Sequence, residues 1–214
     1  MLSIKNFTFN PFQENTYVLY DETKECVIID PGCYDEGEKL ALTTFITEHQ
    51  LKPVYLLNTH CHIDHVLGNR YIYTQYKLQP RIHAKEEMLL SGAQGYGKMY
   101  GIQMEESPAP IIDLEENSEI KFGNSTLKIV FTPGHSPGSV CFHSEADGII
   151  IAGDVLFKQS IGRTDLPGGS MEQLMESIRT RLLILDDNTE VYPGHGDKTT
   201  IGYERSSNPF ILNY

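Results

Sequence analysis

Three histidines and one aspartate fall within six consecutive residues, in the segment Thr59-His60-Cys61-His62-Ile63-Asp64-His65. Imidazole and carboxylate groups are the protein ligands that suit divalent transition ions such as zinc. Gathering so many of them costs desolvation and charge repulsion unless an ion compensates. The apolar run 53–58 just before the cluster predicts a buried strand. The cluster therefore predicts a metal site after a strand end, where α/β folds place their chemistry.

Three further candidate ligands each follow a predicted strand and a glycine. His135 comes after Thr-Pro-Gly, Asp154 after a single glycine, and His195 after Pro-Gly. Glycine lets the backbone turn sharply there without a side chain that blocks the ion. The candidate metal ligands are thus His60, His62, Asp64, His65, His135, Asp154 and His195. These ligands could fill two adjacent sites if one carboxylate is shared by both ions.

Strands predominate in both halves of the chain, with helices between them. Predicted strands cover 2–9, 15–20, 25–30, 53–58, 81–84, 120–122, 127–131, 139–143, 149–152 and 190–192. Predicted helical segments are 36–50, 66–78, the turn 86–90, and 170–186, which opens on the capping box Ser170-x-x-Gln173. Residues 91–110 hold four glycines and predict a long surface loop of the kind that forms lids. The pattern predicts one domain over residues 1–214, an α/β fold in which two mixed β-sheets form a four-layer α/β/β/α sandwich.

Composition narrows the class of partner and the compartment. The chain has 214 residues, 40% of them hydrophobic, and its formal net charge of −12 disfavours nucleic acid or an acidic membrane as a partner. A small-molecule substrate is therefore expected. The first residues hold no charged start followed by an apolar stretch, so a cytoplasmic location is expected. Four cysteines without a Cys-x-x-Cys pair predict reduced thiols.

At this point the chain resembles a known family. The pattern His60-x-His62-x-Asp64-His65, followed by His135, Asp154 and His195, resembles the metallo-β-lactamase-fold hydrolases over nearly the whole chain. The turn Asp30-Pro31-Gly32 is similar to theirs. The segment 162–169, which reads Gly-Arg-Thr-Asp-Leu-Pro-Gly-Gly, and the tail 199–210 look like the glyoxalase II-like branch, the hydroxyacylglutathione hydrolases. Persulfide dioxygenases of the same superfamily carry a similar Gly-Arg-Thr-Asp stretch.

The resemblance implies a role for each ligand. It implies a first divalent ion held by His60, His62 and His135, a second held by Asp64, His65 and His195, and Asp154 as the bridge. Zinc is the expected metal, with iron and manganese as alternatives. The resemblance to the glyoxalase II-like branch implies a thioester as the substrate. A hydroxide between two ions is nucleophilic at neutral pH, and a thiolate leaving group needs little protonation, which suits that reaction. Asp64 is expected to orient the water, which makes Asp64 and Asp154 the candidate catalytic carboxylates. Arg163 is expected either to pair with a substrate carboxylate or to stabilise its loop through Asp165.

The leading hypothesis is therefore a dinuclear metal-dependent thioesterase of the hydroxyacylglutathione hydrolase type. The alternative is a mononuclear iron persulfide dioxygenase, in which His60, His135 and Asp154 alone bind the metal. A non-catalytic module would usually have lost ligands, and β-lactam hydrolysis usually accompanies an exported protein, so both are disfavoured. Glyoxalase II proper is expected to hold glutathione with an additional helical domain, whereas nineteen residues follow His195 here. Either a different thioester is the substrate, or residues 91–110 supply the contacts.

Overall fold

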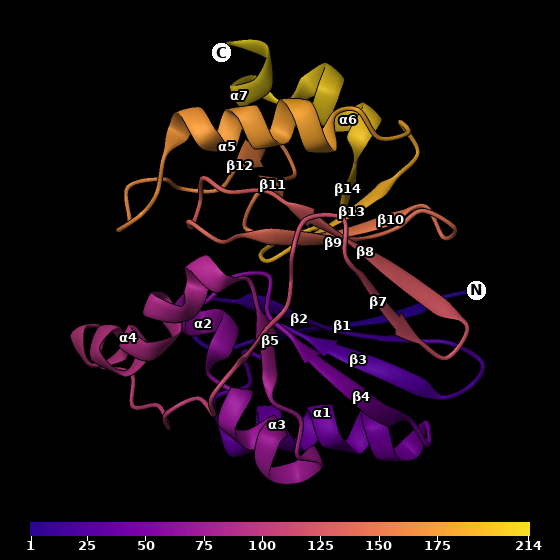
Figure 1. Ribbon diagram of the computed structural model, residues 1–214, viewed down its shortest axis with the longest axis vertical. Coiled ribbons are helices and arrows are strands. Elements are labelled where there is room, and N and C mark those ends of the chain that lie inside the picture. The colour runs from indigo at the N-terminus through magenta and orange to yellow at the C-terminus, as the bar shows by residue number, and fades with distance from the viewer. The chain divides into compact units, whose positions relative to one another are not determined.

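The computed structural model describes residues 1–214, which divide into two compact units. Unit 1 comprises Met1–Asp113 and Lys121–Ser125, and unit 2 comprises Leu114–Ile120 and Thr126–Tyr214. Two six-stranded sheets run in the orders β1-β2-β3-β4-β5-β6 and β14-β13-β10-β9-β8-β7 (Figure 1). Each sheet mixes parallel and antiparallel neighbours, as the sequence predicts.

The first sheet belongs to unit 1. Its strands are β1 (Ser3–Phe9), β2 (Glu14–Tyr20), β3 (Glu25–Ile29), β4 (Lys52–Leu57), β5 (Pro80–Ile82) and β6 (Ile111–Ile112). The helices of this unit are α1 (Glu36–Glu48), α2 (Ile63–Val66), α3 (Asn69–Tyr76) and α4 (Glu87–Met99), with a 3-10 turn at Ala84–Glu86. Apolar side chains of α1 and α3 are buried against those of β2, β3 and β4, so these helices cover one face of the sheet (Figure 1).

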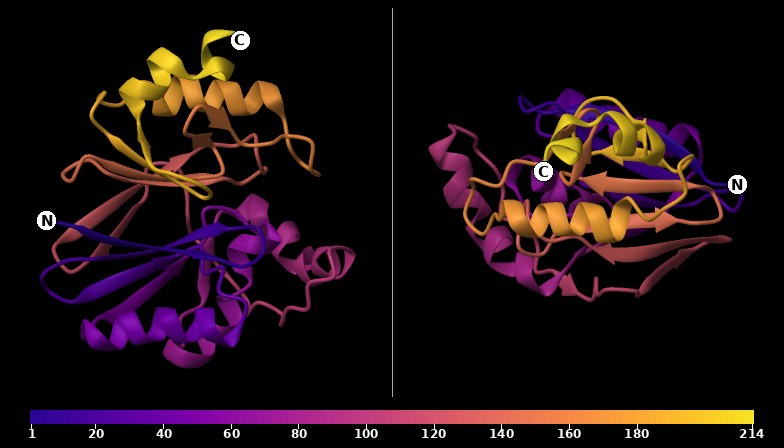
Figure 2. Two further views of the ribbon diagram at one scale, coloured as in Figure 1. Left: turned by 180° about the vertical axis from the view of Figure 1, so that it is seen from behind. Right: turned by 90° about the horizontal axis from the view of Figure 1, so that it is seen from above.

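The second sheet carries the later part of the chain. Its strands are β7 (Glu119–Phe122), β8 (Ser125–Phe131), β9 (Val140–Ser144), β10 (Ile149–Gly153), β13 (Glu190–Pro193) and β14 (Thr199–Thr200). A separate hairpin joins β11 (Leu156–Phe157) to β12 (Ser160–Ile161), and the helices are α5 (Met171–Ser177), a π-helical segment (Ile178–Leu182), α6 (Ile201–Ser207) and α7 (Pro209–Leu212). Helices α5 and α6 cover one face of this sheet (Figure 2), and their apolar side chains are buried with those of β10 and β13. None of the helices combines the length and the apolarity needed to cross a membrane.

One parallel pair of strands in each unit fixes where the following residues emerge. In unit 1, β3 pairs with β4 so that Ile29 lies opposite Leu57. In unit 2, β10 pairs with β13 so that Gly153 lies opposite Pro193. Because parallel strands end at the same edge of a sheet, the residues that follow each pair are brought side by side. Both edges carry candidate ligands.

The predicted loop 91–110 is wrong over its first half, because α4 continues to Met99. Three glycines in this helix lower its intrinsic helix propensity, which misled the sequence-based prediction. Packing overrides that propensity, since Leu90 and Ala93 are buried in an apolar cluster with residues of the ligand loop. Gly97 also allows a close approach, because a Cβ there would lie 3.0 Å from the carbonyl oxygen of Ile102.

Two predicted helices differ in extent. The predicted helix 66–78 is interrupted, so that α2 and α3 flank Gly68, where a Cβ would lie 2.7 Å from the carbonyl oxygen of Pro31. The predicted helix 170–186 passes from α5 into the π-helical segment. Ser170 caps α5 by accepting from the N–H of Gln173, but its own N–H donates to the carbonyl of Gly134 rather than to the predicted capping-box partner. The sequence does not predict β6, β11, β12, β14, α6 and α7, because they are too short to show a period.

All four cysteines are free and buried, in agreement with the predicted reduced thiols. Burial raises the pKa values of the Cys26 and Cys33 thiols to about 12, and raises the pKa of Cys61 well above its ordinary value. Cys61 lies between two candidate ligands, but its side chain packs in the apolar cluster beside α4. No thiolate nucleophile is therefore offered to a substrate.

Candidate metal centre

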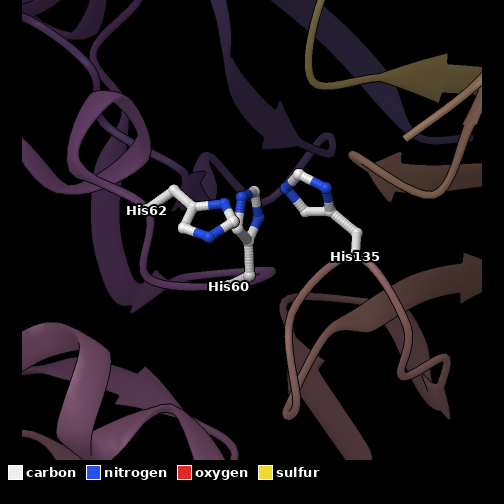
Figure 3. Close-up of side chains that lie close together, drawn as sticks. All are labelled: His60, His62 and His135. Atoms are coloured by element: carbon white, nitrogen blue, oxygen red, sulfur yellow. The ribbon is translucent and has the colours of Figure 1, made fainter. Parts of the chain in front are cut away.

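The first ligand set consists of His60, His62, Asp64 and His65 and follows β4 in unit 1. The rings of His60 and His62 lie edge to face with their centroids 4.8 Å apart (Figure 3). The ring centroids of His60 and His65 are 4.1 Å apart, and a carboxylate oxygen of Asp64 lies 3.7 Å from Nε2 of His65. Within unit 1 the structure thus brings all four of these predicted ligands together.

Asp30, which follows β3, orients two imidazoles of this set. Its carboxylate accepts hydrogen bonds from the backbone N–H of Thr59 at 2.7 Å and from the Thr59 hydroxyl at 2.6 Å. Nδ1 of His65 lies 3.1 Å from the same carboxylate, and since a carboxylate can only accept, Nδ1 carries the proton. The Thr59 hydroxyl donates its hydrogen bond to Asp30, so its oxygen accepts a hydrogen bond from Nδ1 of His60 at 3.0 Å. Both imidazoles therefore offer the lone pair of Nε2, as metal-binding histidines do.

Side chains from other elements hold the backbone of the ligand loop. Nδ2 of Asn10 donates to the carbonyl of Asp64 at 3.0 Å, and the carboxylate of Glu86 accepts from the N–H of Cys61 at 2.8 Å. Sequence reasoning missed these contacts, because nothing in the local sequence links the partners. It also interpreted Asp30 only as part of a turn, although Asp30 is the last residue of a predicted strand.

A second buried carboxyl group lies beside His65. Glu14 is fully buried, and its Oε1 lies 4.0 Å from Nδ1 of His65. Burial raises the pKa of Glu14 well above its ordinary value, because the charged form is poorly solvated there. Two buried carboxyl groups, those of Glu14 and Asp30, thus flank one imidazole.

The second ligand set consists of His135, Asp154 and His195 and lies in unit 2. Figure 3 shows His135 on the loop that follows β8. Oδ2 of Asp154 lies 3.5 Å from Nε2 of His135 and 3.6 Å from Nε2 of His195. Nδ1 of His135 faces the carbonyl of Arg163 at 2.8 Å, so Nδ1 donates and Nε2 is again the free nitrogen. Within unit 2 the structure brings the three predicted ligands together around one carboxylate.

The glycine preceding each ligand of this set has the predicted function in two cases. Gly134 has a φ of 139° and Gly153 a φ of 49°, both in the region that favours glycine. At the third turn the positive φ, 74°, belongs to Gly196. Gly194 instead donates its N–H to the carbonyl of Gly153 at 2.8 Å, which links the ends of β10 and β13.

Gly162 approaches the second ligand set so closely that a methyl group should disturb it. A Cβ there would collide with the carbonyl oxygen of Asp154 and lie 3.2 Å from Cβ of His135. We expect Gly162→Ala to destabilise the fold by about 2 kcal/mol, as overpacking does, and to weaken metal binding. The melting temperature should fall by roughly 4–8 °C in differential scanning calorimetry.

Gly95→Ala is the matched control, because a Cβ at this position in α4 meets nothing within 4 Å. Removing a glycine from a helix stabilises it by roughly 0.5–1 kcal/mol, so the control should melt at the same temperature or slightly higher. An unchanged melting temperature for Gly162→Ala would contradict the close approach.

Arg163 forms a bidentate pair within its own loop. Its Nε and Nη2 each donate to a carboxylate oxygen of Asp165 at 2.7 Å, and both side chains are exposed. The guanidinium lowers the pKa of Asp165 to about 2. The loop-stabilising alternative is therefore present in the structure, and binding of a substrate carboxylate by Arg163 stays a prediction.

Comparison with known proteins places these features in a family context. Residues 9–195 match the family model described as the metallo-beta-lactamase superfamily. The probable metallo-hydrolase YqgX of Bacillus subtilis is 38% identical over 95% of this chain and 95% of its own length. The hydroxyacylglutathione hydrolase GloC of Haemophilus influenzae is 34% identical, over 98% of both chains.

Two solved structures are similar over almost the full length. The BLEG-1 B3 metallo-β-lactamase has a TM-score of 0.87 and 37% identity, covering 98% of this chain and 99% of its own. TTHA1623, solved in a di-iron-bound form, has a TM-score of 0.87 and 36% identity, covering 96% of this chain and 99% of its own. These likenesses confirm the predicted metallo-β-lactamase fold.

Proposed function

We propose that this chain, which belongs to the metallo-β-lactamase superfamily and is a metal-dependent hydrolase, cleaves thioesters with two bound divalent ions. The reaction is that of a hydroxyacylglutathione hydrolase. The observation that carries this proposal is the position of Asp154, whose Oδ2 lies within 3.6 Å of two imidazole nitrogens and suits a carboxylate shared by two ions. The 34% identity with GloC over 98% of both chains supports thioesters as the substrate class.

The donor atoms of both ligand sets fit divalent transition ions. In His60, His65 and His135 a fixed partner accepts a hydrogen bond from Nδ1–H, which leaves the lone pair of Nε2 to bind. One ion would be held by His60, His62 and His135 and the other by Asp64, His65 and His195, with Asp154 shared. Zinc is the proposed metal because imidazole and carboxylate ligands suit it. Iron is the alternative, since TTHA1623 was solved with two iron ions.

The two carboxylates have separate tasks in the proposed reaction. When bound, the ions would supply a hydroxide at neutral pH and polarise the thioester carbonyl. Asp64, whose side chain is 13% exposed, would accept a hydrogen bond from the attacking water and orient it. Asp154 would keep His135 and His195 converged on the same point. The leaving thiolate needs no general acid, because ordinary thiols have pKa values near 8.5.

Metal content joined to thiol release tests this function. The chain is prepared without chelator, its metals are measured by elemental analysis, and hydrolysis of lactoylglutathione is followed by release of the thiol. We expect about two ions per chain, and loss of at least a hundredfold in rate on chelation that returns on adding zinc. A single iron ion, no thiol release, and oxygen consumption with glutathione persulfide would instead support a persulfide dioxygenase.

β-Lactam hydrolysis is a second candidate, because the BLEG-1 enzyme, described as a B3 metallo-β-lactamase, is 37% identical over 98% of this chain. The same ligands would serve, but the leaving amine of a β-lactam must be protonated, whereas a thiolate need not be. A cephalosporin should therefore be a poorer substrate than lactoylglutathione. A higher kcat/KM for the cephalosporin would reverse the order of the two candidates.

A further inference from the structure

We propose that Glu86 is a positioning residue that fixes the His60–Cys61 peptide group, which lies between the candidate ligands His60 and His62. The proposal rests on the proposed function only in that these two histidines hold an ion. Glu86 is 1% exposed, and its carboxylate accepts the N–H of Cys61 at 2.8 Å from 25 positions away in the sequence. Its reach to the ligand loop comes from the fold and not from the local sequence.

Cys61 is anchored on two sides. Its N–H is held by Glu86, and its side chain is packed in the apolar cluster with Ile63, Leu90 and Ala93. His60 and His62 flank this anchored residue, so its backbone angles set the relative direction of their side chains. The two rings meet with an interplanar angle of 87°. Losing the hydrogen bond would free the peptide group to rotate and would loosen this arrangement.

A buried carboxylate is costly unless its surroundings compensate. An apolar residue of similar volume is often as stable as a charged side chain in such a place, or more stable. Glu86 nevertheless stands at a buried position, directly before α4. The hydrogen bond from the N–H of Cys61 gives the carboxylate a partner there, which accounts for a side chain that reaches the ligand loop.

A simpler account of Glu86 must be separated from this one. Glu86 ends the 3-10 turn Ala84–Glu86 and directly precedes α4, and negative charge at a helix N-terminus is stabilising. That role depends on charge and not on reach. The positioning role depends on reach, because the acceptor oxygen must arrive at the N–H of Cys61.

Two conservative variants separate reach from charge. Glu86→Gln keeps an acceptor oxygen at the same distance and loses the charge, whereas Glu86→Asp keeps the charge and withdraws the oxygen by roughly 1.5 Å. We expect Glu86→Asp to weaken zinc binding by about 10–100-fold, as loss of a contact that orients metal ligands does. Glu86→Gln should stay within about threefold of the wild type. A helix-terminus role predicts instead that Glu86→Gln loses stability and that neither variant loses zinc affinity.

Zinc affinity is measured on the folded, metal-free chain by competition with a chromophoric chelator, with circular dichroism to verify the fold. Asp21→Asn is the matched control, because Asp21 is 3% exposed and its carboxylate accepts the N–H of Asn124 at 2.7 Å in the same unit. It should lose stability but keep its zinc affinity.

A second readout follows the ligands themselves. Imidazole NMR signals of His60 and His62 in the metal-free chain should shift or broaden in Glu86→Asp and not in Asp21→Asn. Equal zinc affinities of Glu86→Asp and wild type would overturn the positioning role, although the proposed thioesterase activity could still be measured. A wild-type chain that binds no zinc, iron or manganese would contradict both proposals.

Discussion

Replacing Asp154 by asparagine is expected to lower metal-dependent hydrolysis by about a thousandfold and to reduce the bound metal to about one ion per chain or fewer. Asp154 is the carboxylate to which Nε2 of both His135 and His195 converge, at 3.5 and 3.6 Å. Asparagine keeps the size of the side chain but removes the negative charge, so an ion between these groups loses its strongest electrostatic partner. Elemental analysis and steady-state kinetics on the same preparation give both values.

Asp197→Asn is the matched control for this change. Asp197 lies two positions beyond His195, and its side chain is 81% exposed and paired with Lys158 at 3.2 Å. An exposed ion pair contributes only about 0–1 kcal/mol, so this variant should keep both its metals and its rate. An Asp154→Asn chain that retains two ions and a rate within tenfold of the wild type would contradict the shared-carboxylate arrangement.

Replacing Asp30 by asparagine is expected to have the largest effect on stability. The carboxylate accepts from the N–H and the hydroxyl of Thr59 and from Nδ1 of His65, and Asp30 is 1% exposed. The NH2 group of an asparagine would face one of these three donors, which would then have no acceptor. We expect the metal-free chain to lose about 3 kcal/mol and its melting temperature to fall by roughly 6–12 °C. Zinc affinity should fall by about 10–100-fold, because His65 loses the partner that orients it.

Asp35→Asn is the control for a mere loss of carboxylate charge in unit 1. Asp35 caps α1 by accepting from the N–H of Glu38 at 2.9 Å, and asparagine is an equally good residue at that position. Its melting temperature and zinc affinity should match the wild type. The melting temperature is measured by calorimetry on metal-free protein and the zinc affinity by chelator competition. If both values for Asp30→Asn matched those for Asp35→Asn, the assignment of Asp30 as the residue that orients Thr59 and His65 would be refuted.

Local sequence patterns indicated the candidate ligands more readily than the groups that orient them. The first set of candidate ligands falls within six residues, and each member of the second set follows a strand and a glycine, so local patterns are sufficient to propose them. The partners of these ligands are distant in sequence. Asp30 is 35 positions from His65, and Nδ1 of His135 is held by a carbonyl 28 positions away. Only the pairing of the strands and the path of the loops brings such groups together.

Helix α4 shows the opposite failure, where a local signal was misleading. Glycines at 92, 95 and 97 indicate a loop by propensity, yet the segment is helical to Met99. Burial of Leu90 and Ala93 against the ligand loop supplies free energy that propensity does not include. The same contact makes α4 part of the support of the first ligand set, which composition alone could not reveal.

Because all four cysteines are buried, their reaction with a thiol reagent reports unfolding of the chain. Aromatic disulfide reagents react with thiolates, and the folded chain shields all four thiols from solvent and holds the pKa values of Cys26 and Cys33 at about 12. Coloured product formed during thioester turnover would therefore come from substrate alone. In the absence of substrate, the slow rate at which these thiols are labelled would measure how often the chain opens. Saturating zinc should lower the rate of thiol labelling if the ions bind only the folded chain.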